Sequence, residues 1–136
     1  MSKTVWFISS LLVLSFVTMT VLAVRVFSQR GHYPKTEVKL FTLFALLAGL
    51  WSLGTCFELL LPSLQAKIFW AQIQYFSIVF LPLVWVFFLT RYTDVGRRFQ
   101  QLAYLAFIPS LATLGVVWTN EQHGLMWSHI RLEPAP

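Results

Sequence analysis

The sequence predicts an all-α membrane protein with four transmembrane helices, because four long apolar segments fill most of the 136-residue chain. Residues 5–24, 40–57, 68–90 and 99–120 contain no charged side chain. A helix rises about 1.5 Å per residue and the hydrocarbon core of a bilayer is about 30 Å thick, so about 20 apolar residues are needed to cross it. Each segment is therefore long enough to form a transmembrane helix.

The composition supports the same class, since 57% of the residues are hydrophobic and only 11% are charged, against about 25% in soluble domains. Barrel strands are excluded because their side chains alternate between apolar and polar, and open strands are excluded because lipid offers their backbone no hydrogen-bond partner. We expect one membrane domain over residues 1–136. Its helices are predicted at about residues 5–27, 39–61, 67–90 and 99–119, followed by a tail over residues 120–136.

The first segment follows Lys3 and has some likeness to a secretory signal peptide. A cleavable signal has an apolar region of about 7 to 15 residues followed by a small-residue cleavage site. Here the apolar run is longer and ends in Val24-Arg25-Val26-Phe27. We interpret it as a first helix that is retained.

Small residues in the second and fourth segments recur every three or four positions, which places each set on one helix face. Such faces let helix backbones approach closely, so they predict helix packing, with a pore or groove as the alternative. The two sets are Ala45, Ala48, Gly49 and Ser52, and Ala103, Ala106, Ser110 and Thr113.

Pro82 and Pro109 lie within the third and fourth segments. Each proline removes a backbone donor and favours a kink. A kink can serve as a hinge for signal transmission or simply give the helix the shape that packing requires. The hinge role of both prolines is a hypothesis.

Basic residues in the connections predict the orientation in the membrane. The first connection holds Arg25, Arg30, Lys35 and Lys39, the third holds Arg91, Arg97 and Arg98, and the opposite side holds Lys3, Lys67 and Arg131. The positive-inside rule then places the first and third connections in the cytoplasm, and both termini outside. The net charge of +5 is accounted for by these connections and gives no reason to expect nucleic acid.

The spans lack the residues that most chemistry needs. No Asp, Glu, Lys, Arg or His lies near the middle of a span, where such residues mark proton relays and ion paths. The single cysteine, Cys56, has no neighbouring metal ligands, and no nucleophile constellation or Gly-rich phosphate loop is visible. The sequence therefore predicts a protein that is not an enzyme and has no metal site or cofactor.

Polar and aromatic side chains gather in the predicted outer third. Gln74 would lie roughly 9 Å below the outer end of its span, where an amide needs a partner on another helix or a ligand. The candidate ligand-sensing residues are Glu58, Trp70, Gln74, Asn120, His123 and Trp127. An aromatic belt combined with helix-to-helix hydrogen bonding would account for the same residues without a ligand.

Several motifs add a resemblance to this reading. They are Leu50-Trp51-Ser52-Leu53 with Glu58, Lys67-Ile68-Phe69-Trp70, Leu81-Pro82-Leu83-Val84-Trp85, Arg91-Tyr92-Thr93, Ile108-Pro109-Ser110, and the segment from Thr119 to Trp127 with its Thr-Asn-x-x-His pattern. With these motifs the chain resembles the N-terminal seven-helix membrane region of bacterial sensor histidine kinases, over nearly its whole length.

The resemblance implies a sensory input module in the bacterial inner or plasma membrane. Such regions have seven helices and continue into a cytoplasmic output module, commonly a histidine kinase with a PAS domain, or a diguanylate cyclase. Only four helices are predicted here, so we expect a truncated module that lacks helices five to seven and is not catalytic by itself. Expected partners are the lipid bilayer and either the missing helices or further copies of the chain.

Two functions from other classes remain open on the sequence. A small four-helix transporter or channel subunit acting as an oligomer would suit four spans, although no span carries a charge near its middle. A membrane scaffold or assembly partner is the other alternative.

Overall fold

The computed structural model describes residues 3–32, 35–93, 101 and 103–128. Its helices are α1 (Lys3–Ser28), α2 (Lys35–Leu60), α3 (Leu64–Tyr92), α5 (Phe107–Trp118) and the single turn α6 (Asn120–His123). No strand occurs among the described residues, which confirms the all-α class. Arg97 and Arg98 of the predicted third connection, residues 99, 100 and 102 at the start of the predicted fourth span, and the predicted tail beyond Ser128 lie outside the described residues.

Three helices are long and apolar enough to cross a membrane, namely α1, α2 and α3. A shorter apolar helix extends over Ala103–Trp118 and includes α5. The helix is interrupted by a turn at Ala106, so α5 begins at Phe107 and Pro109 lies in its first turn. Because a proline at position 109 cannot donate to the carbonyl of Leu105, this break is where its effect is expected.

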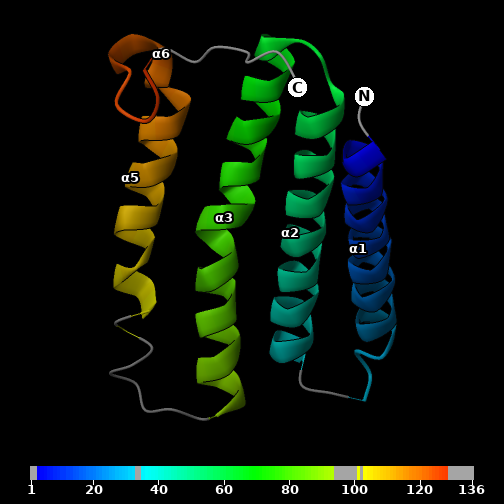
Figure 1. Ribbon diagram of the computed structural model, residues 1–136. Helices are drawn as coiled ribbons and strands as arrows, with labels where there is room; N and C mark the ends of the chain where they lie inside the picture. Colours follow the sequence, from blue (N-terminus) through cyan, green and yellow to red (C-terminus); the bar gives the residue numbers. More distant parts are fainter. Residues whose placement is uncertain (1–2, 33–34, 94–100, 102, 129–136) are drawn as a thin grey trace.

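The helices stand side by side in chain order, as a row (Figure 1). α2 packs against α1 and α3, and α3 also packs against α5, while no other pair of these long helices is in contact within the described part of the chain. The α2–α3 turn, the start of α1 and α6 lie at the upper ends of the helices in Figure 1. We call this side of the structure the α2–α3 end. The last turns of α1 and α3 and the first turn of α2 lie at the opposite ends of the helices, here called the α1–α2 end.

The predicted small face of α2 packs against α1. A Cβ atom added at Gly49 would lie 3.4 Å from Cδ2 of Phe16, so a glycine here allows the two helices to approach closely. One turn away, the hydroxyls of Ser15 and Ser52 are 3.0 Å apart. Ala45 is fully buried. The packing role predicted for this face is confirmed.

The corresponding face of the fourth segment is covered more loosely. Ala103 is buried, whereas Ala106, Ser110 and Thr113 are half-buried. The hydroxyls of Ser110 and Thr113 bond to the carbonyls of Ala106 and Pro109 within their own helix, at 2.8 and 2.9 Å. These hydroxyls therefore do not link α5 to a neighbouring helix.

α3 has a helix on each side, because it packs between α2 and α5. Its first turn is capped by Ser63, whose Oγ accepts a hydrogen bond from the backbone N–H of Ala66 at 3.4 Å. The helix continues through Pro82 without interruption. In the half beyond Pro82, aromatic rings fix α3 to α2: the rings of Phe44 and Trp85 are 5.1 Å apart, and those of Phe41 and Phe88 are 5.8 Å apart.

Candidate functional site

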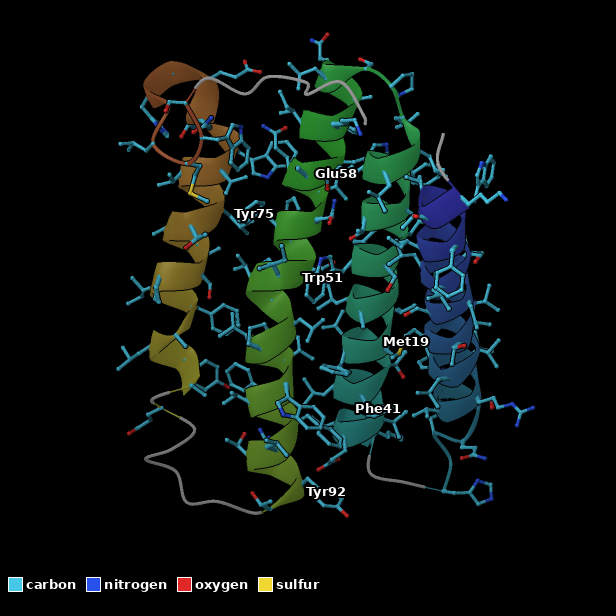
Figure 2. All side chains as sticks on the ribbon, viewed as in Figure 1. Met19, Phe41, Trp51, Glu58, Tyr75 and Tyr92 are labelled. Atoms are coloured by element: carbon cyan, nitrogen blue, oxygen red, sulfur yellow. The ribbon has the colours of Figure 1, made fainter. Side chains whose placement is uncertain are left out.

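The six candidate residues fall into two groups on different sides of α3. Glu58, Trp70 and Gln74 lie at the α2–α3 interface, whereas Asn120, His123 and Trp127 surround a groove between α3 and α6. Figure 2 shows Glu58 on α2 and Tyr75 on α3 in the half of the row nearest the α2–α3 end. The structure thus brings all six residues to the α2–α3 end of the helices, but not into one site.

The Gln74 amide connects α3 to α2. Gln74 is only 6% exposed; its Oε1 accepts a hydrogen bond from Thr55 Oγ1 at 2.8 Å, and its Nε2 donates to Glu58 Oε2 at 2.7 Å. Both polar atoms of the side chain therefore have partners on the neighbouring helix. This satisfies the requirement that a buried amide be hydrogen-bonded, and the hydrogen bond to a carboxylate belongs to the stronger class.

Gly54 makes this connection sterically possible. A Cβ atom at position 54 would lie 2.5 Å from Cγ of Gln74, closer than real side chains approach one another. Cγ is near the root of the glutamine side chain, so moving it would move the amide away from Thr55 and Glu58. The glycine is needed here for close approach between helices.

Glu58 also receives a hydrogen bond through its backbone. Lys67 Nζ donates to the Glu58 carbonyl oxygen, which lies in the last turn of α2, where carbonyls lack helical partners and a cation is favourable. The carboxylate itself is half-buried, and within the described residues Oε1 accepts no hydrogen bond. That oxygen is free to bind water or a ligand donor.

Trp70 lies against α2. Its ring stacks on Phe57 with the centroids 4.4 Å apart and an interplanar angle of 20°. Ser77, one turn beyond Gln74 on the same helix, is fully buried, and its Oγ has no hydrogen-bond partner among the described residues. Trp70, Gln74 and Ser77 are spaced by four and three residues and so share one face of α3. On this face Trp70 and Gln74 contact α2.

Asn120 organises the turn that follows α6. Its Oδ1 accepts hydrogen bonds from the backbone N–H groups of Met126 and Trp127 at 2.8 and 3.3 Å, and its Nδ2 donates to the Trp127 carbonyl at 3.1 Å. Asn120 is 7% exposed. Its side chain therefore holds the wall of the groove in place, and both Oδ1 and Nδ2 bond to the backbone of that wall.

His123 is fixed by two neighbours. Nδ1 accepts a hydrogen bond from the backbone N–H of Leu125 at 3.0 Å, and Nε2 lies 3.0 Å from Thr119 Oγ1. Thr119 Oγ1 gives its proton to the Gly115 carbonyl at 2.6 Å, so the imidazole must donate from Nε2. With Nδ1 as the acceptor, this hydrogen-bond pattern requires a ring proton on Nε2.

The groove between α3 and α6 has a volume of about 470 Å³. Its lining residues are Leu64, Ile68 and Gln72 from α3, and Asn120, Glu121, Gln122, His123, Gly124, Trp127 and Ser128. Trp127 also packs on Tyr75, with the ring centroids 5.8 Å apart. A groove with aromatic and amide groups at its wall can bind a small ligand through hydrogen bonds and stacking.

Three residues outside the six predicted ones contribute to these groups. Thr55 precedes Glu58 by three residues, so helical spacing from a chosen residue would have identified it. Gln72 is only two residues from Trp70 and from Gln74, so its signal in the sequence is its polarity within the predicted outer third and not its spacing. Tyr75 gives no comparable signal, because its role depends on which helix packs beside it.

The two prolines lie away from both groups. Pro82 lines an apolar groove of about 420 Å³ together with Phe44, Trp51, Ile78, Leu81 and Trp85. Pro109 is exposed in the first turn of α5. Their hinge role stays a prediction.

A further cavity of about 580 Å³ lies at the α1–α2 end, distant from the six residues. Its lining residues are Val26, Gln29, Glu37, Val38, Phe41, Phe88, Arg91 and Tyr92, of which Phe41 and Tyr92 are labelled in Figure 2. Among the described residues no group of three His, Cys, Asp or Glu side chains could hold a metal ion. The side chains at both groups offer hydrogen bonds and aromatic contacts.

The family model described as the N-terminal 7TM region of histidine kinase matches residues 11–136. No curated protein and no solved structure matches the chain.

Proposed function

Since the chain belongs to the family of the N-terminal 7TM region of histidine kinase, we propose that it is the sensory input module of a bacterial receptor, embedded in the cell membrane and without catalytic activity of its own. Full-length relatives carry a cytoplasmic output module, which the family description identifies with a histidine kinase. The same kind of input module would also suit a diguanylate cyclase output module. The apolar helices α1, α2 and α3 support the membrane location.

The proposed topology has four crossings, with the α2–α3 end outside and the α1–α2 end in the cytoplasm. The fourth crossing would include the apolar helix Ala103–Trp118. The basic residues described at the α1–α2 end support this orientation through the positive-inside rule; they are Arg25, Arg30, Lys35, Lys39 and Arg91. The open row of helices also leaves room for helices five to seven of the family to pack beside it.

The observation that carries the proposal is the pair of neighbouring residues Gln74 and Tyr75. Gln74 connects α3 to α2 through Glu58, while Tyr75 contacts Trp127 in the wall of the α3–α6 groove. A ligand that changes the position of Trp127 therefore acts on the same turn of α3 that holds α2. The helix would pass this change toward the cytoplasm, with Pro82 and Pro109 as proposed hinges.

The mechanism is a population shift between two packings of α3. It requires a ligand that binds one packing more tightly than the other. The ligand-sensing residues proposed here remain Glu58, Trp70, Gln74, Asn120, His123 and Trp127, with the groove as the point of binding and the Glu58–Gln74 pair as the responding contact.

The test uses the full-length receptor that carries this region, with its output measured by a transcriptional reporter over a panel of growth conditions. The triple substitution E58Q, Q74L and H123A should abolish the difference between inducing and non-inducing conditions. The matched control combines S10A and T18V, whose hydroxyls bond only to carbonyls of their own helix, Phe7 and Leu14. A triple variant that responds like the control would place sensing elsewhere.

A liposome flux assay separates the proposal from the transporter or channel alternative. The purified chain should give no substrate- or ion-dependent flux above that of empty liposomes. Flux that depends on the protein would overturn the sensory proposal in favour of an oligomeric transporter or channel subunit.

A further inference from the structure

Three basic side chains surround a small recess at the α1–α2 end. The recess has a volume of about 240 Å³ and is lined by Phe27, Arg30, Lys35, Val38 and Lys39. No carboxylate is among its lining residues, and none of the three cations forms an ion pair within the described part of the chain. The recess thus concentrates unpaired positive charge.

The turn after α1 positions Arg30. The backbone N–H of Gln29 bonds to the Val26 carbonyl at 3.2 Å, and that of Arg30 bonds to the Phe27 carbonyl at 3.3 Å. This tight turn directs the guanidinium back over the ring of Phe27, with Cζ 4.7 Å from the ring centroid. The cation–π contact fixes the orientation of a side chain that would otherwise be mobile in solvent.

The helical period of α2 separates the cations from the nearby carboxylate. Lys35 and Lys39 are four residues apart and lie on one face, whereas Glu37 is two residues from each and lies on another. Glu37 lines the neighbouring 580 Å³ cavity, together with Arg91, and is not among the residues that line the recess. The charge of the recess is therefore left uncompensated by the acidic residue closest to it in sequence.

We propose that this recess binds the phosphate headgroup of an anionic phospholipid. Arg30, Lys35 and Lys39 would contact the phosphate oxygens, and the exposed apolar surface of Phe27 would contact the glycerol and the first acyl carbons. The first turn of α2 adds unpaired backbone N–H groups and partial positive charge to the same place.

A membrane lipid is favoured over a soluble anion by the position of the recess. It lies where two helices end that are long and apolar enough to span a bilayer, which is the level of the headgroups. Basic pockets between transmembrane helices on the cytoplasmic side are suited to acidic headgroups. The inference is independent of the sensory role, since it uses neither the α3–α6 groove nor the Glu58–Gln74 pair.

The experiment measures lipid binding by native mass spectrometry of the detergent-solubilised chain with added phosphatidylglycerol. The triple variant R30Q, K35Q and K39Q should raise the Kd for phosphatidylglycerol roughly 100-fold, because each basic side chain near an anionic lipid contributes about a fivefold factor. The matched control R91Q, R97Q and R98Q removes equal charge from the other basic connection and should change the Kd less than about threefold.

Two further arms decide the identity of the ligand. Phosphatidylcholine should bind clearly more weakly than phosphatidylglycerol, and soluble glycerol phosphate at the same concentration should not displace the lipid. Equal binding of both lipids, displacement by glycerol phosphate, or equal losses in the two triple variants would overturn the proposal. If the triple variant does not fold, lipid binding is measured for the single variants K35Q and K39Q. Unchanged binding in both would overturn the proposal.

Discussion

Gln74 Nε2 on α3 donates a 2.7 Å hydrogen bond to Glu58 Oε2 on α2, while Gln74 Oε1 accepts from Thr55 on the same neighbouring helix. The pair joins two helices through a side chain that is almost entirely buried, since Gln74 is 6% exposed. It also lies beside Tyr75, which contacts the wall of the groove. Several consequences of this arrangement can be measured.

Replacing Gln74 with leucine should weaken the α2–α3 pairing. The substitution keeps the side-chain size but removes both hydrogen bonds, and interhelical hydrogen bonds in membranes contribute about 0.6 to 1.7 kcal/mol. We expect a loss of about 1 kcal/mol in the free energy of unfolding, measured by SDS titration with circular dichroism. The control Q65L, on the exposed first turn of α3, should leave the unfolding curve within error of the wild type. An equal loss of stability in both variants would show that the Gln74 hydrogen bonds do not cause it.

Replacing Gly54 with alanine should destabilise the protein through a steric effect. The added Cβ would lie 2.5 Å from Gln74 Cγ, and overpacking of this kind costs about 1 to 3 kcal/mol. The cost should largely disappear in a Q74A background, which a double-mutant cycle measures. G115A is the matched control, since a Cβ there meets nothing within 4 Å; a loss as large as that of G54A would show that the effect is not steric.

Replacing Asn120 with alanine should loosen the turn after α6. The turn would lose its hydrogen bonds to Met126 and Trp127. Hydrogen–deuterium exchange at the amides of these two residues should accelerate by about tenfold, corresponding to about 1.4 kcal/mol of local stability. The exposed Gln122 offers the control Q122A, which should leave exchange at these amides unchanged.

Replacing Pro82 with alanine tests the hinge hypothesis. Alanine would restore the backbone donor to the carbonyl of Ile78 and remove the steric reason for a kink. The full-length receptor should then keep its expression level but lose at least half of its reporter response. P62A, in the exposed α2–α3 turn, should retain the response. A P82A receptor with normal response and normal stability would restrict Pro82 to a packing role.

Much of the fold could be predicted because the relevant signal is local. The lengths of α1, α2 and α3 follow from uninterrupted hydropathy, and the close packing at Gly49 follows from a run of small residues at helical spacing. The open row was not foreseen, since hydropathy does not state which helices are neighbours. The fourth segment also differed in detail, because the turn at Ala106 divides it.

The candidate site could be predicted only as a set of residues. Sequence position indicated that Gln74 needs a partner, and topology placed Glu58 and His123 at the same end. It did not indicate that Gln74 bonds to Glu58 while His123 bonds to Thr119 and Leu125. Trp70 was grouped with Trp127, yet Trp70 stacks on Phe57 at the α2 side of α3.

The sequence by itself determined that the chain is an apolar helical protein of a membrane, with polar residues concentrated toward one end, because hydropathy and charge depend only on the residues present. Only the tertiary structure decided that these polar residues form an α2–α3 link and a separate groove. The physical reason is that spacing along a helix gives the angles between its side chains, but not the rotation of the helix as a whole. A helix such as α3, apolar on nearly all sides, takes that rotation from its neighbours.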